Sequence, residues 1–128
     1  MKKILIVDDQ SAWRNFNSQA VFEIFGNSAE VVTASSAQEA YNLLLERFST
    51  PFDCIITDMQ MEDDYAPKMA GEWLIEQTKE LPPYVNTKII IVSASMQSKQ
   101  IAESYGVEYL SKAVAASSIE AYKSMLGT

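Results

Sequence analysis

The chain has 128 residues and 14.3 kDa, and its 48% hydrophobic and 21% charged residues predict one globular domain and exclude a disordered chain. The net charge of −7 argues against direct binding to nucleic acid or to an anionic membrane surface. A single cysteine excludes an intrachain disulfide, and the lack of histidine excludes a histidine base, metal ligand or phosphate carrier within the chain.

The apolar run near the N-terminus is short, which bears on where the protein resides. Two lysines precede the apolar residues Ile4–Val7, but four residues are too few for the core of a signal peptide. No segment reaches the roughly 20 apolar residues that a membrane helix needs. We therefore expect a cytoplasmic protein that has no contact with a membrane.

Short apolar runs alternate with helical periodicity along the chain. The runs predict strands that are buried on both faces, at residues 4–7, 31–33, 54–57, 89–92 and 107–110. Apolar spacing of three and four residues predicts helices at 13–25, 36–48, 71–81, 98–105 and 117–126. Because the order is strand then helix five times, we predict an α/β fold, with helices on both faces of a parallel sheet.

Several residues mark where these elements begin and end. Gly26 is expected to end the first helix, and Pro51 to close the second. Two capping-box patterns predict helix starts: Ser36 with Glu39, and Ser117 with Glu120. Residues 59–70 have no periodicity and contain the acidic run 62–64, which we expect to be a solvated loop. The packing residues are expected to include Cys54, Met59, Met61 and Met69.

Polar side chains follow four of the predicted strands at the point where each strand ends. The carboxyl ends of parallel strands share one edge of a sheet, which is where ligands bind in open α/β sheets. We therefore expect carboxylates, a hydroxyl and a lysine to converge at one edge; the residues are Asp8, Asp9, Asp58, Ser93, Ser111 and Lys112. Each alone is more typical of a turn or a solvated surface, but their shared placement favours a site.

A cluster of this composition has a limited chemistry. Three carboxylates a few ångströms apart repel one another unless a cation lies among them, and oxygen ligands suit Mg²⁺. Beside such a cation, an aspartate can attack phosphorus as a nucleophile. The cation and the ammonium group of Lys112 would then offset charge on the phosphoryl oxygens, and the Ser93 hydroxyl could donate a hydrogen bond to them.

Four short motifs carry a resemblance to a known family: ILIVDD at 4–9, IITDMQM at 55–61, IVSA at 91–94 and YLSK at 109–112. Together they resemble the receiver domain of two-component response regulators, and especially the single-domain chemotaxis type, over essentially the whole chain. The resemblance implies one receiver domain over residues 1–128. It also implies a doubly wound, flavodoxin-like (βα)5 sandwich of three layers, with strand order 2-1-3-4-5.

The resemblance implies a metal-dependent phosphorylation site. Asp58 would accept a phosphoryl group from a phosphohistidine on a partner, either a sensor histidine kinase or a histidine phosphotransferase. The cofactor would be Mg²⁺, or alternatively Mn²⁺, bound directly by Asp9, Asp58 and the backbone carbonyl of Gln60, with Asp8 acting mainly through water. The only activities expected are phosphotransfer to Asp58 and its later dephosphorylation, with no turnover of a metabolite.

The resemblance implies that other residues would respond to the phosphoryl group or set the rate at which it is lost. Lys112 would pair with the group, Ser93 would move to bond it, and Tyr109 would change rotamer. The small Ala94 would leave room, while the side chains of Gln60 and Ser95 would set the dephosphorylation rate. The predicted helix 98–105, strand 107–110 and last helix would form the output face, which would bind a downstream protein, an output domain or a second copy of the chain.

The chain departs from the family pattern in two places. Ala113 follows Lys112, where the family usually has proline in a cis peptide, and we expect this loop to be trans because a cis bond before another residue costs about 3 kcal/mol. Glu62 follows Met61 in place of proline, and Gly71 comes 13 residues after Asp58, about five more than usual. These changes keep open a degenerate receiver that binds partners without phosphorylation.

A small enzyme on the same fold is a third hypothesis. A flavin carrier would need a loop rich in serine, threonine or glycine after the first strand, but Asp8 and Asp9 have the wrong charge there. A phosphatase of the haloacid-dehalogenase type would need an aspartate two residues after its nucleophile, and Gln60 occupies that position. Glycines occur only at 26, 71, 106 and 127, which excludes a nucleotide-binding P-loop.

Overall fold

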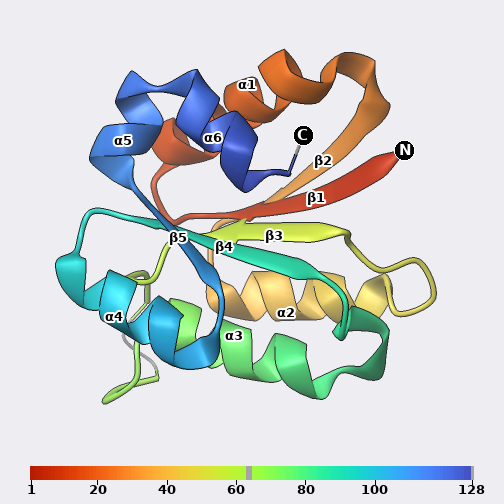
Figure 1. The fold of residues 1–128 in the computed structure, drawn as a ribbon. Coiled ribbons are helices and arrows are strands. Elements are labelled where there is room, and N and C mark those ends of the chain that lie inside the picture. Colours follow the sequence, from red (N-terminus) through yellow and green to blue (C-terminus); the bar gives the residue numbers. More distant parts are fainter. Residues whose placement is uncertain (63–64, 128) are drawn as a thin grey trace.

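A five-stranded parallel sheet forms the centre of the computed structural model, which describes residues 1–62 and 65–127 (Figure 1). The strands are β1 (Lys2–Val7), β2 (Ala29–Ala34), β3 (Cys54–Thr57), β4 (Lys88–Ser93) and β5 (Glu108–Ser111). Their order across the sheet is β2-β1-β3-β4-β5, and every neighbouring pair is parallel. The doubly wound, flavodoxin-like arrangement predicted from the sequence is therefore confirmed.

Helices cover both faces of the sheet and complete the three layers (Figure 1). One face carries α1 (Ser11–Phe25), α5 (Lys112–Ser117) and α6 (Ile119–Met125). The other face carries α2 (Ala37–Glu46), α3 (Ala70–Glu80) and α4 (Met96–Tyr105). Two short 3-10 turns, η1 (Gly26–Ser28) and η2 (Pro82–Tyr84), lead into strands. Among the described residues, none of the helices has the length and apolar character that crossing a bilayer requires.

The central strands are buried on both faces, as their continuous apolar runs predict. Ile4 and Ile6 of β1 pack toward α1 and α6, whereas Leu5 and Val7 pack toward α2 and α3. Cys54 is only 3% exposed, and burial raises the pKa of its thiol to about 12. The predicted packing roles of Cys54 and of the three methionines are confirmed, since all four belong to or pack against the apolar clusters.

Two of the predicted helix ends are confirmed. Gly26 follows α1 with a φ of +56°, and its N–H donates to the carbonyl of Phe22. The Ser36 hydroxyl accepts a hydrogen bond from the Glu39 N–H at 3.0 Å at the start of α2. The reciprocal half of that capping box is shifted by one residue, because the Glu39 carboxylate accepts from the N–H of Ser35 at 2.6 Å.

The predicted start of the last helix at Ser117 is wrong. Ser117 lies inside α5, and its hydroxyl donates to the carbonyl of Ala113 at 3.0 Å. The next residue, Ser118, is extended and caps α6 by accepting from the N–H of Ala121 at 3.1 Å. The expected loop after β5 is therefore a short helix, which begins at Lys112 and is capped by the Ser111 hydroxyl.

Three other helix limits differ by two residues from those predicted. Helix α4 begins at Met96 rather than at Ser98, because Ser95 caps it by accepting from the N–H of Gln97 at 3.1 Å. Helix α2 ends at Glu46 rather than at residue 48, and residues 47–49 continue as a turn. Helix α1 begins at Ser11 rather than at residue 13. All three differences lie at helix ends, where local hydrogen bonds rather than apolar spacing decide the limit.

Candidate functional site

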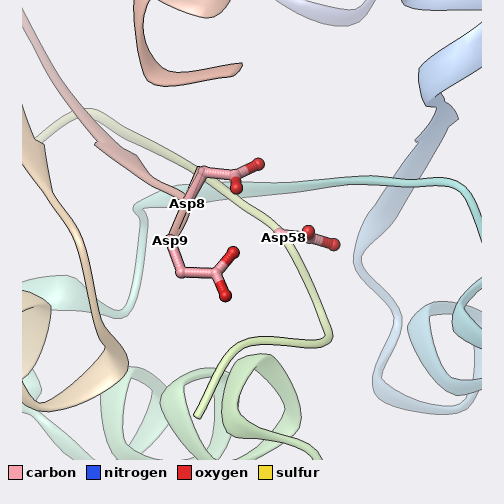
Figure 2. Close-up of side chains that lie close together, drawn as sticks. All are labelled: Asp8, Asp9 and Asp58. Carbon is pink, nitrogen blue, oxygen red and sulfur yellow. The ribbon is translucent and has the colours of Figure 1, made fainter. Parts of the chain in front are cut away.

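Three carboxylates meet at the carboxyl edge of the sheet (Figure 2). Asp8 and Asp9 follow β1, and Asp58 follows the neighbouring strand β3, whose Thr57 pairs with Val7. One oxygen of each carboxylate lies within 4.8 Å of the others. Asp8 is 1% exposed and Asp58 is 7% exposed, while Asp9 faces solvent. The structure thus brings together the three acidic residues that strand-end placement selected.

Backbone groups hold two of these carboxylates in place. The Gln10 N–H donates to Asp8 Oδ1 at 2.9 Å, and the Met59 N–H donates to Asp58 Oδ1 at 2.7 Å. The guanidinium group of Arg14, in the first turn of α1, donates to the backbone carbonyl of Asp8 at 2.8 Å. Hydrogen bonds to a carboxylate stabilise its charged form, so the Gln10 N–H opposes the effect of burial on the pKa of Asp8.

Lys112 supplies the cation of the cluster. Its ammonium group donates to Asp58 Oδ2 at 3.0 Å and lies 3.3 Å from Asp8 Oδ2. The side chain is only 12% exposed, so these ion pairs are poorly screened by water. The Lys112–Ala113 peptide is trans, as expected, and Lys112 enters the site from the first turn of α5.

Burial and neighbouring charges shift the pKa of three groups. Burial raises the pKa of the Asp8 carboxyl, and the charge of Asp58 raises it further against the opposing effects of the Gln10 N–H and Lys112. Burial alone would lower the pKa of Lys112, but its hydrogen bond to Asp58 and the two carboxylate charges outweigh burial and raise it. Burial also raises the pKa of Tyr109, with a contribution from Asp58. Lys112 is therefore held as a cation.

A hydroxyl cluster borders the carboxylates at the end of β4. Ser93 is buried, and its Oγ lies 3.0 Å from the Oγ of Ser98 in α4. The Tyr109 hydroxyl lies 3.1 Å and 3.2 Å from the carbonyl oxygens of Ser93 and Ser95. Sequence reasoning missed Ser98 as a member of this cluster, because nothing in the sequence marks this serine as buried.

The three residues expected to tune the site differ in exposure. Gln60 and Ala94 are exposed, and Ser95 is half-buried. The Ser95 side chain is engaged as the cap of α4, an interaction that the sequence analysis did not predict. Of these three residues, Gln60 and Ala94 therefore have side chains that are open to solvent.

Gly71 fixes the distance between α3 and the Asp58 backbone. A Cβ at this position would lie 2.4 Å from the Asp58 carbonyl oxygen and 2.7 Å from the Cα of Met59. The Gly71 N–H donates to the Met59 carbonyl at 2.9 Å, which ties the helix start to the acidic loop. Only glycine fits here, so this residue, used above for spacing alone, helps to place Asp58.

The segment 59–70 is called the extended segment below, and several of its described residues contact α2 and α3. The Glu62 carboxylate accepts from the N–H groups of Ala37 and Gln38, at 2.9 Å from Ala37, and so caps α2. The Tyr65 ring stacks on Trp73 with 4.4 Å between centroids. The predicted solvated loop is thus wrong for Glu62, which is half-buried. Asp63 and Asp64, which belonged to the same prediction, lie outside the described residues.

Residues 4–122 match the family model of the response regulator receiver domain. The chain belongs to this family. It is similar to chemotaxis protein CheY4 of Vibrio cholerae, at 28% identity and a TM-score of 0.68 over 88% of this chain and 87% of that one. A response regulator receiver domain protein of Clostridium thermocellum is 29% identical, with a TM-score of 0.66 over 98% and 99% of the two chains.

The phosphorylated cyanobacterial phytochrome response regulator RcpA, 20% identical, shares the fold with a TM-score of 0.79 over 97% of this receiver domain and 90% of that chain. None of the curated protein sequences compared with this receiver domain matches it. Receiver domains in general bind Mg²⁺ at an acidic pocket and interact with histidine kinases and output partners. The family predicted from the four motifs is confirmed.

The donor atoms of this receiver domain fit such a cation. Every side chain of the carboxylate cluster offers hard oxygen ligands, which suit Mg²⁺ or Mn²⁺ better than softer metals. Three carboxylates face one lysine, so the cluster carries excess negative charge, and Asp9 remains open to solvent. The residues present therefore fit a divalent cation.

Proposed function

We propose that this receiver domain is a phosphorylation-dependent signalling switch in which Asp58 accepts a phosphoryl group. The observation that carries the proposal is the contact of 3.0 Å between Lys112 Nζ and Asp58 Oδ2, within a cluster whose three carboxylates lie within 4.8 Å of one another. A nucleophilic carboxylate needs a nearby cation to offset charge on the incoming phosphoryl oxygens, and Lys112 is in that position.

The divalent cation would be held by residues on the same edge of the sheet. Asp9, Asp58 and the backbone carbonyl of Gln60 would bind Mg²⁺, or alternatively Mn²⁺, directly, and Asp8 would act mainly through water. When bound, the metal would offset charge on the phosphoryl oxygens. The burial of Asp8 and its hydrogen bond from the Gln10 N–H suit an indirect role, since its carboxylate is already held on the protein side.

The transfer step exchanges one bond to phosphorus for another. A carboxylate oxygen of Asp58 attacks the phosphorus of a phosphohistidine on the partner, and the new O–P bond forms as the P–N bond breaks. The electron pair of that bond stays on the imidazole nitrogen, which takes a proton from water. Because this chain has no histidine, the donor is a partner, either a sensor histidine kinase or a histidine phosphotransferase. Later attack by water on phosphorus restores the Asp58 carboxylate.

Phosphorylation would be read out through the hydroxyl cluster. The Ser93 hydroxyl would leave Ser98 to donate to the phosphoryl group, and Tyr109 would change its rotamer. Both residues adjoin α4 and β5, which with the last helices would form the output face for a downstream protein, an output domain or a second copy of the chain. Ala94 would leave space for the group, and Gln60 and Ser95 would influence its lifetime.

The proposal treats residues 1–128 as one receiver domain acting in the cytoplasm. Intact mass before and after incubation with acetyl phosphate and Mg²⁺ tests it. The expected result is one added phosphoryl group on the wild type and none on Asp58→Asn. Asp53→Asn is a matched control, because Asp53 is an exposed aspartate that accepts from the Lys3 N–H outside the site, and this variant should still be labelled.

A fast hydrolysis step could hide the adduct, so a second measurement accompanies the first. Beryllofluoride, a stable mimic of the phosphoryl group, should change the tryptophan and tyrosine fluorescence of the wild type but not of Asp58→Asn. If neither the mass nor the fluorescence changes, Asp58 is not an acceptor. That outcome would favour a receiver domain that binds partners without phosphorylation.

A further inference from the structure

The Lys112 ammonium group has a third neighbour besides the two carboxylates. It lies 4.9 Å from the ring centroid of Trp13, over the face of the indole. Trp13 belongs to the first turn of α1, whereas Lys112 begins α5, so the contact joins distant parts of the chain. An ammonium group over an indole face is attracted by the negative charge of the π system, and indole is the strongest partner of this kind. The Lys112 ammonium group thus contacts two carboxylates and one aromatic ring.

The Trp13 ring is itself held in place. Its edge packs against the Phe16 ring, with 5.1 Å between centroids and 69° between planes. Both rings pack against the apolar cluster between the sheet and α1. The backbone N–H of Trp13 donates to the Gln10 carbonyl at 3.1 Å, and the guanidinium group of the next residue, Arg14, donates to the Asp8 carbonyl. The first turn of α1 is therefore anchored to the same loop that supplies the acidic residues.

This aromatic contact differs from the two carboxylate contacts during the proposed reaction. When Asp58 is phosphorylated, one of its oxygens becomes part of an acyl phosphate, and the attraction between its carboxylate and Lys112 changes. The indole carries no charge that the reaction alters. A lysine side chain has four rotatable bonds, and here alanine rather than proline follows it, so a fixed aromatic face limits where its ammonium group can lie.

We propose that Trp13 is a positioning residue for Lys112, and that its ring face keeps the ammonium group directed at Asp58 while the phosphoryl group is transferred. This inference rests on the proposed function of Asp58. It assigns a role to the first turn of α1 that strand-end placement did not predict. Trp13 acts through Lys112 and does not itself touch the phosphoryl group.

The test compares substitutions that keep or remove the aromatic face. The initial rate of mass gain from acetyl phosphate in Mg²⁺ is measured for the wild type, Trp13→Phe and Trp13→Leu. We expect Trp13→Leu to be about 10-fold slower, and Trp13→Phe to stay within about 3-fold of the wild type, because phenylalanine retains a weaker π face. Trp73→Leu removes the other tryptophan, which lies on the opposite face of the sheet beside α2, and should leave the rate unchanged.

A spectroscopic readout follows the contact without phosphorylation. In a Trp73→Phe background Trp13 is the only indole, and Lys112→Met should change its emission intensity because the cation leaves the ring face. Lys99→Met, which removes an exposed lysine in α4, should not. Thermal unfolding of every variant identifies the temperature at which all of them are folded, and the rates are compared there.

The outcomes separate this inference from the proposed function. If the wild type gains no phosphoryl group and does not respond to beryllofluoride, the proposed function fails. If the wild type is labelled but Trp13→Leu is equally fast, or Trp13→Phe is as slow as Trp13→Leu, then the aromatic face has no positioning role. Unchanged Trp13 emission in the Lys112→Met variant would also overturn the inference.

Discussion

Two segments beside the acidic cluster depart from the usual receiver pattern, and the structure accommodates them in opposite ways. The segment after β5 is short: it lacks the proline, turns at once into α5, and is tied to the cluster by one charged side chain, that of Lys112. The extended segment after β3 is long, yet its side chains Glu62, Tyr65 and Lys68 make their hydrogen bonds and ring contacts with α2 and α3.

The comparison suggests that one segment serves mainly phosphorylation and the other mainly the stability of the fold. The short segment contributes a reacting partner, so a change there should alter phosphorylation more than stability. Beyond Gln60, the described residues of the extended segment, 61–62 and 65–70, contribute packing, so a change there should alter stability more than phosphorylation. Gly71, which directly follows the extended segment, differs because it lies against the Asp58 backbone. The four substitutions below test this division, from the largest expected effect to the smallest.

Gly71→Ala should have the largest effect, and on both properties. Its new methyl group would lie 2.4 Å from the Asp58 carbonyl oxygen, so α3 or the acidic loop must move. We expect a loss of about 3 kcal/mol of unfolding free energy in urea and no detectable phosphoryl group on Asp58. Gly106→Ala is the control, since its Cβ meets nothing within 4 Å and its φ of +70° costs only about 1 kcal/mol. Equal losses would contradict the proposed clash.

Lys112→Met should slow phosphorylation strongly. It removes the ammonium group that lies 3.0 Å from Asp58 while keeping an unbranched side chain of similar length. Loss of one prearranged charged donor typically costs about 100-fold in rate, and we expect that order of change in the initial rate with acetyl phosphate. The exposed Lys99→Met provides the reference. A rate near that of the wild type would mean that the short segment is dispensable for the chemistry.

Glu62→Ala should affect stability alone. The variant leaves the N–H groups of Ala37 and Gln38 without their carboxylate partner, and losing such a cap costs about 1 kcal/mol in denaturant unfolding. The initial rate of phosphorylation should stay close to that of the wild type. Glu46→Ala, at the other end of α2, removes an exposed carboxylate and should change the free energy of unfolding by less than about 0.5 kcal/mol. A slowed rate in Glu62→Ala would join the extended segment to the chemistry.

Lys68→Met should have the smallest effect, and it should depend on pH. Lys68 and then Tyr105 donate hydrogen bonds to Glu76, which lowers the pKa of that carboxyl below its ordinary value of 4.5. A lowered pKa in the folded state adds stability above pH 4.5, and that stability is lost as the pH falls through the folded-state value. Because the pair is partly exposed and screened by water, its contribution to stability at pH 7 should be small. Wild type and variant should therefore become equally stable in strong acid.

Much of the fold could be predicted from the sequence, because parallel strands buried on both faces leave a plain signal. The apolar runs at 4–7, 54–57 and 89–92 lie within β1, β3 and β4. All carboxyl ends of a parallel sheet lie on one edge, so the positions of Asp8, Asp58 and Lys112 after strands predicted that they lie close together. The structure has them in contact or within 4.8 Å. Residues whose position is decided by the sheet were therefore the predictable ones.

The interactions that escaped prediction are those made between elements by side chains outside the sheet. Glu62 caps a helix that begins 25 residues earlier in the chain, and the Trp13 ring of α1 contacts the Lys112 ammonium group of α5. Ser117 and Ser118 are adjacent, and because the short helix α5 includes Ser117, it is Ser118 that caps α6. Periodicity and motif spacing describe one element at a time, so they do not contain such contacts.

The buried thiol has a practical consequence. Cys54 lies in β3 with a pKa of about 12, so maleimide and iodoacetamide reagents should leave it unmodified in the folded protein near pH 7. If one cysteine were introduced on the surface of α4 and another on the surface of α6, these two would be the only reactive cysteines. Pairs of spin labels attached in this way would report distances between helices before and after beryllofluoride, without first removing the native residue.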